Sequence, residues 1–117
     1  MIRMIAAIIP CALFATVVFA GDTAFDFRPS IAVKPGSELL LKGVRGRNCR
    51  DPAPSWEEVA ERLPPSLTGL FSDGGLGTVR SRACGKAVPA RGVKFTATTK
   101  GRERFTLYRD RIAVTVF

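Results

Sequence analysis

The sequence of 117 residues contains no His and no Gln, and Asn48 is its single Asn. Without His, the chain cannot build a Ser-His-Asp triad, a Cys-His dyad, or a metal or haem site with imidazole ligands. A Gly-rich phosphate-binding loop is also missing, as are internal repeats. We therefore expect a single-domain protein that is not an enzyme and that carries no metal and no cofactor.

Acidic residues are few, and several of them occupy positions that acidic residues commonly take in helices and turns. Of the 10 Asp and Glu residues, Glu57, Glu58 and Glu61 lie on one expected helix, and Asp73 precedes two glycines in an expected turn. A hydrolase that works through carboxylates alone needs two acids facing one cleft. That alternative stays open, and single replacements of these four acids are its test.

The first twenty residues have the pattern of an export signal. Arg3 is followed by an uncharged and mostly apolar stretch, and the segment closes on Val18-Phe19-Ala20, with tolerated small residues before a cleavage site. This predicts a cleavable signal peptide over residues 1–20 and one exported domain over residues 21–117. The protein is expected to be bacterial and to be located in the periplasm or secreted. The alternative is a membrane anchor, but the apolar stretch is somewhat short and Pro10 interrupts it.

Cysteine is scarce, and its use follows from that location. Cleavage after Ala20 removes Cys11 and leaves Cys49 and Cys84 as a pair in an oxidising compartment. A pair of thiols far apart in sequence and without His fits neither a zinc site nor a redox C-x-x-C motif. We predict that Cys49 and Cys84 form a structural disulfide.

Short segments in which apolar and polar residues alternate make up most of residues 21–117. Alternation with a period of two is typical of sheets that have one solvated face. Lys34-Pro35-Gly36-Ser37 and Asp73-Gly74-Gly75 contain turn-forming pairs, so each is expected to close a hairpin. This predicts about seven strands, at residues 30–33, 38–44, 67–71, 76–83, 93–98, 104–107 and 112–116. The last of them, apolar and terminal, is expected at an exposed sheet edge.

One short helix is expected over residues 55–63. Ser55 and Glu58 have the spacing of a capping box, and Pro64-Pro65 ends the segment. Its apolar residues fall at helical spacing, at Trp56, Val59, Ala60 and Leu63. The helix is expected to pack this face on the core, with partner binding as the alternative.

These elements predict a mainly β fold, a small sandwich of about seven strands with one helix and one disulfide. The stretch from Gly92 to Phe117, together with the early turn at Lys34-Pro35-Gly36-Ser37, resembles the immunoglobulin-like sandwich modules of bacterial envelope proteins. The resemblance covers roughly half of residues 21–117. It implies an immunoglobulin-like β-sandwich and transfers no functional residues.

Positive charge is the most informative polar feature, because 18 Lys and Arg outnumber the acids and give a net charge of +8. Two runs of basic residues without an intervening acid surround the two cysteines. A disulfide between the cysteines would bring the two basic runs together. Arg predominates over Lys and makes bidentate contacts with carboxylates and phosphates. The candidate residues for binding an anion or a partner are Lys42, Arg45, Arg47, Arg50, Arg80 and Arg82. The alternative is a basic surface that only keeps the protein soluble.

We therefore expect a small exported interaction module that binds an envelope or extracellular protein, as an inhibitor, an immunity-type protein or an accessory subunit. The alternative is an adhesion or polyanion-binding module that uses the arginine-rich patch on acidic polymers or lipid headgroups. Nucleic acid is disfavoured, because the chain has one Trp and one Tyr for stacking on bases and its Phe residues lie on expected core faces.

Overall fold

The computed structural model describes residues 23–117, so the expected signal peptide at 1–20 lies outside the described residues. This part of the chain is mainly β, and none of its helices is long and apolar enough to cross a membrane. It contains six strands and one helix, in the order β1 (Ser30–Val33), β2 (Glu38–Arg45), α1 (Trp56–Ala60), β3 (Gly69–Ser81), β4 (Lys86–Ala97), β5 (Gly101–Leu107) and β6 (Asp110–Val116).

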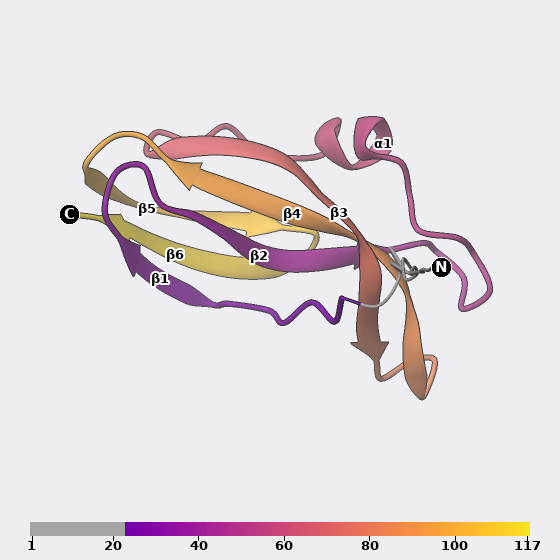
Figure 1. Ribbon diagram of the computed structural model, residues 1–117. Coiled ribbons are helices and arrows are strands. Elements are labelled where there is room, and N and C mark those ends of the chain that lie inside the picture. The colour runs from indigo at the N-terminus through magenta and orange to yellow at the C-terminus, as the bar shows by residue number, and fades with distance from the viewer. Residues whose placement is uncertain (1–22) are drawn as a thin grey trace, which may run out of the picture.

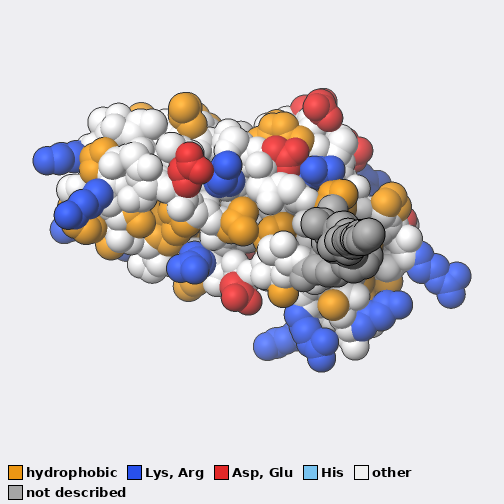
Figure 2. All heavy atoms as spheres, viewed as in Figure 1, with side chains coloured by type: hydrophobic (Ala, Val, Ile, Leu, Met, Phe, Trp, Pro, Cys, Tyr) orange, Lys and Arg blue, Asp and Glu red, His pale blue; other side chains and the backbone are white. Residues whose placement is uncertain are grey.

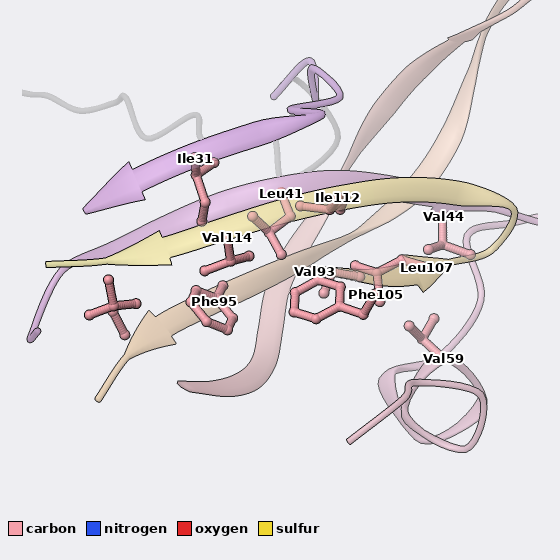
Figure 3. Packing of buried hydrophobic residues seen from close by; sticks show 12 residues of the cluster. Ile31, Leu41, Val44, Val59, Val93, Phe95, Phe105, Leu107, Ile112 and Val114 are labelled. Carbon is pink, nitrogen blue, oxygen red and sulfur yellow. The ribbon is translucent and has the colours of Figure 1, made fainter. Parts of the chain in front are cut away.

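The strands form two three-stranded sheets, with the orders β1-β6-β5 and β2-β4-β3. The sheets lie face to face in Figure 1, and β3 and β4 continue past them as a projecting hairpin. Buried side chains of both sheets meet between them, with Phe95 and Phe105 near the centre and Val59 of α1 at one end (Figure 3). The protein thus has the two-layer core of a sandwich.

Strand β6 shows why alternation in the sequence predicted the core well. Ile112, Val114 and Val116 are buried, and the residues between them are partly exposed. The expectation of an exposed edge is wrong, however, because β6 pairs with β1 on one side and with β5 on the other. Its apolar residues therefore lie in the middle strand of the sheet, where both neighbours help to bury them.

The first turn has the expected local structure but a different role. The Ser37 amide donates to the Lys34 carbonyl at 3.1 Å, and Gly36 has a φ of 91°. The predicted hairpin between residues 30–33 and 38–44 is wrong, because β1 pairs in parallel with β6 and β2 pairs with β4. The turn instead carries the chain from one sheet to the other.

The prediction of seven strands is also wrong, and Asp73-Gly74-Gly75 is the reason. These residues form no hairpin turn but an irregularity within β3, where the pairing shifts between Asp73 and Leu76. The Asp73 carboxylate accepts a hydrogen bond of 2.7 Å from the Gly75 amide, which stabilises the bulge. Two expected strands are therefore one long strand, and the hairpin turns later, after Ser81.

Helix α1 begins where the capping box predicted it. The Ser55 hydroxyl accepts the Glu58 amide at 3.2 Å and lies 3.3 Å from the Glu58 carboxylate. Val59 is fully buried, and Trp56 and Leu63 pack partly against the core. The helix is shorter than expected, because it ends at Ala60. The packing prediction is confirmed for all of the apolar face except Ala60, which is exposed.

Candidate functional site

The predicted disulfide between Cys49 and Cys84 is confirmed, with a Cα–Cα distance of 5.6 Å. Cys49 lies in the loop that follows β2, and Cys84 lies in the turn of the β3–β4 hairpin. Ser81 organises this turn, because its hydroxyl accepts the Cys84 amide at 3.1 Å and its carbonyl accepts the Gly85 amide at 2.8 Å. The bond therefore ties the loop after β2 to the far end of the hairpin.

An open cleft of about 720 Å³ lies where these two segments approach the turn between β5 and β6. We call it the arginine cleft, because its lining includes four arginines from three separate segments: Arg45, Arg47, Arg80 and Arg109. Phe25, Phe27, Val79 and Tyr108 provide apolar wall, and Asp26 and Asp110 are the acids in the lining. In Figure 2, Lys and Arg side chains project around the end of the molecule that carries the hairpin tip.

The sequence-predicted anion-binding residues separate into three groups. Arg45, Arg47 and Arg80 line the arginine cleft together. Arg50 and Arg82 are exposed but are not part of the lining. Lys42 reaches the cleft but is buried and already bound, because its ammonium group lies 2.7 Å from the Asp110 carboxylate. The expected patch is therefore partly assembled.

A β-bulge explains why Lys42 is buried. The pairing of β2 with β4 shifts between Leu40 and Lys42, so that Leu41 has no partner residue on β4. Lys42 consequently pairs with Val93 and lies on the side of the sheet that faces β5 and β6. Its ammonium group also donates to the Leu107 and Tyr108 carbonyls, at 3.2 and 3.4 Å. The lysine thus holds the β5–β6 turn against β2.

Sequence reasoning missed Arg109, which lies in that turn. The segment Arg109-Asp110-Arg111 reads as a polar corner, and nothing in it indicates which distant strand it approaches. The structure shows that Tyr108 and Arg109 form a two-residue turn, because Leu107 pairs with Asp110. Both turn residues have positive φ, 47° for Tyr108 and 76° for Arg109.

Phe25 forms the inner wall of the cleft, on a surface made by glycines of β2 and β4. A Cβ atom at Gly43 would lie 2.8 Å from Cδ2 of the Phe25 ring, and one at Gly92 would lie 2.7 Å from Cε1. Both are closer than real Cβ atoms approach. The Phe25 amide donates to the Thr78 carbonyl at 2.8 Å, which fixes the segment beside β3. Glycine at these two positions is therefore needed for the Phe25 ring to pack this closely on the sheet.

The positive charge in the cleft is largely uncompensated within the described residues. Residues 23–117 form three ion pairs, which use Lys42, Arg91 and Lys94, and none of the cleft arginines takes part. Arg45 donates to the carbonyls of Gly46 and Arg47, which orients its guanidinium group. Burial raises the pKa of Tyr108 above its usual value, and the nearby Arg62 opposes this effect only in part. The Tyr108 hydroxyl is therefore neutral at pH 7 and donates a hydrogen bond to the Val59 carbonyl.

The acids proposed for a carboxylate hydrolase do not form one group. Asp73 lies in the β3 bulge, 3.2 Å from the Arg91 guanidinium. Glu58 and Glu61 border a separate hollow together with Arg62, and Glu58 also serves the helix cap. Within residues 23–117, no three residues among His, Cys, Asp and Glu are grouped so that they could hold a metal ion.

Comparisons of the chain with models of known protein families, with characterised proteins and with solved structures found no match.

Proposed function

We propose that the protein is a small exported interaction module that binds an acidic surface of another protein through the arginine cleft. The observation that carries this proposal is the convergence of Arg45, Arg47, Arg80 and Arg109 on one open cleft. Guanidinium groups form forked hydrogen bonds with carboxylates, so several of them in one hollow suit a partner rich in Asp and Glu.

A protein partner is favoured over a simple polyanion by the apolar wall of the cleft. Phe27 is 43% exposed, and Tyr108 lines the cleft beside the arginines. Aromatic residues and Arg are the residue types enriched at protein interfaces and at their hot spots. A groove that only tracks a charged polymer backbone needs no such wall.

The scaffold supports the same proposal, because the cleft is built before any partner arrives. The disulfide, the Lys42–Asp110 ion pair and the Phe25 packing each fix one of its walls. A rigid site loses little conformational entropy on binding. A structural disulfide also fits the proposed periplasmic or secreted location, where thiols are oxidised.

We infer further that the sandwich is an immunoglobulin-like variant. The order β2-β4-β3 corresponds to strands B, E and D of that fold, and the β5–β6 hairpin corresponds to strands F and G. In this correspondence, the segment that contains α1 stands in the chain where strand C would be. A function in recognition suits such a module, although the fold alone assigns none.

The test is affinity capture from an envelope extract, with the oxidised exported protein as bait. An Arg47→Ser/Arg80→Ser variant removes two exposed charges from the cleft, and an Arg102→Ser/Arg104→Ser variant removes two exposed charges from β5. We expect one protein to be retained in high salt by the wild type and the β5 variant, and lost by the cleft variant.

The polyanion alternative predicts a different pattern. Heterogeneous acidic material would then be captured, high salt would release it, and both charge variants would weaken its retention to a similar degree. That outcome would replace the proposed protein partner with a polymer. Equal capture of one protein by all three forms would remove the arginine cleft from the interface.

A further inference from the structure

The β5–β6 turn carries a conformation that its residues do not favour. A two-residue hairpin turn with positive φ at both positions is typically built from Asn-Gly or similar pairs. Here the two positions are Tyr108 and Arg109, at φ 47° and 76°. Large side chains in the left-handed region strain the backbone, and such strain gathers at functional sites.

Surrounding residues hold the turn in this conformation. The Lys42 ammonium group binds the Leu107 and Tyr108 carbonyls and the Asp110 carboxylate, so it contacts both strands next to the turn. On the other side, the Tyr108 hydroxyl donates to the Val59 carbonyl at 3.2 Å. A buried lysine and a helix therefore brace two residues that Asn and Gly would replace without strain.

The turn also lies where the concave surfaces of this end meet. Tyr108 lines the arginine cleft and two adjoining hollows, and Arg109 lines the cleft and one of those hollows. Arg47 lines all three. Arg109 is exposed, and no hydrogen bond or ion pair within residues 23–117 uses its guanidinium group. The strained turn thus presents a cation and an aromatic ring next to each other.

We propose that Tyr108 and Arg109 determine what the arginine cleft binds, and that the ligand is a peptide segment with an Asp or Glu next to an apolar residue. Arg109, with Arg47, donates to the carboxylate, and the Tyr108 ring packs on the neighbouring apolar side chain. This inference rests on the proposed function and adds the chemistry of the partner segment. It also gives a reason for the strain, because Asn-Gly would provide neither group.

Two blocked peptides of the same length and charge test the ligand chemistry. The first is acetyl-Gly-Asp-Leu-Asp-Leu-Gly-amide, and the second has Ser in place of each Leu. Titration of the isotope-labelled protein, expressed from its full coding sequence and purified after export, is followed by NMR. We expect the first peptide to bind about tenfold more tightly, as burial of one apolar side chain provides, and to shift the amides of residues 107–110.

The decisive variant is Arg109→Gly, because it should raise the thermal stability of the protein and lower its affinity for the peptide. Glycine accepts the turn conformation, so the variant should gain about 4 °C in Tm, yet it should lose most of its affinity for the Leu peptide. Arg104→Gln, which removes one exposed charge from β5, should bind within twofold of the wild type. An Arg109→Gly variant that binds like the wild type would overturn the inference.

The remaining outcomes separate this inference from the proposed function. If Arg47→Ser/Arg80→Ser abolishes peptide binding but Arg109→Gly does not, the cleft binds acids and the turn does not select them. If both peptides bind equally, the apolar contact with Tyr108 is refuted. If inorganic tripolyphosphate displaces the Leu peptide and binds more tightly, the site serves a phosphate polymer, and both proposals fail.

Discussion

The space between the sheets and the region around the arginine cleft are built by different means. Between the sheets, apolar side chains from alternate strand positions fill the volume, and three phenylalanine rings contact one another with centroids 5.2–6.1 Å apart. Around the cleft, one phenylalanine lies on glycines, one lysine is buried with an acid, and a disulfide joins the loops. The stability of the first region depends on the total volume of its apolar side chains, and that of the second depends on the exact positions of a few atoms.

This difference predicts how each region responds to substitution. A core of interdigitating apolar side chains tolerates exchanges that conserve volume but not large cavities. A wall in which a ring touches backbone, or an ammonium group touches three oxygens, tolerates neither added nor removed atoms. The cleft should therefore be more sensitive to small changes than the core, although the core contributes more to stability.

The largest effect is expected from Phe95→Ala. Phe95 is fully buried and contacts Phe71 and Phe105, so its removal leaves a cavity between the sheets. We expect a loss of about 3–5 kcal/mol in the free energy of unfolding, measured in urea. Phe95→Leu keeps most of the volume and should cost about 1.5 kcal/mol or less. Equal losses for the two variants would show that volume does not govern this region.

Removal of the disulfide is the next largest change. A Cys49→Ser/Cys84→Ser variant loses a cross-link between residues 35 positions apart, which should cost about 3–4 kcal/mol. It also frees the loop that carries Arg47 from the hairpin that carries Arg80. Reduction of the wild type should give the same urea midpoint as the variant. A loss of less than about 1 kcal/mol would mean that the glycine and lysine contacts alone hold this end.

Gly92→Ala tests whether exact placement governs the cleft region. The added Cβ would lie 2.7 Å from the Phe25 ring and 3.2 Å from the Gly74 carbonyl oxygen, so one methyl group should cost about 1–3 kcal/mol. Phe25→Ala makes room for that methyl group. The double variant should therefore be more stable than the sum of the two single losses predicts, as a double-mutant cycle in urea would show.

The smallest effect concerns the sandwich end away from the cleft, where Glu103 of β5 binds the segment before β3. Burial would raise the pKa of Glu103, but hydrogen bonds from Ser66, Thr68 and the Leu67 amide outweigh it and lower the pKa below its usual value. Ionised Glu103 therefore stabilises the fold above its unfolded pKa, and this contribution is lost as pH falls through the folded pKa.

Glu103→Gln is the variant that isolates this contribution. It should reduce stability at pH 7 and make the remaining stability less dependent on pH in the acidic range, as urea unfolding at several pH values would show. Glu57→Gln, on the exposed face of α1, serves as the control and should keep the pH dependence of the wild type. An unchanged acid profile in Glu103→Gln would contradict the assigned role.

Local chemistry made much of the fold predictable. The capping of α1 by Ser55 and the inward face of β6 depend on residues two or three positions apart, so the sequence contains all the information they need. The disulfide was predictable for another reason, because cleavage of the expected leader leaves only two cysteines. Those two cysteines also indicated that the basic runs around them would meet.

What the sequence by itself determined is therefore the mainly β character of the fold, the start of α1, the inward face of β6, one covalent link and an excess of arginine. Only the tertiary structure decided that β1 pairs with β6, that Asp73-Gly74-Gly75 bends a strand instead of ending it, and that the β5–β6 turn completes the arginine cleft. The physical reason is distance along the chain. Lys42 lies 68 residues from Asp110 and pairs with it because a bulge in β2 turns its side chain inward, which no local pattern indicates.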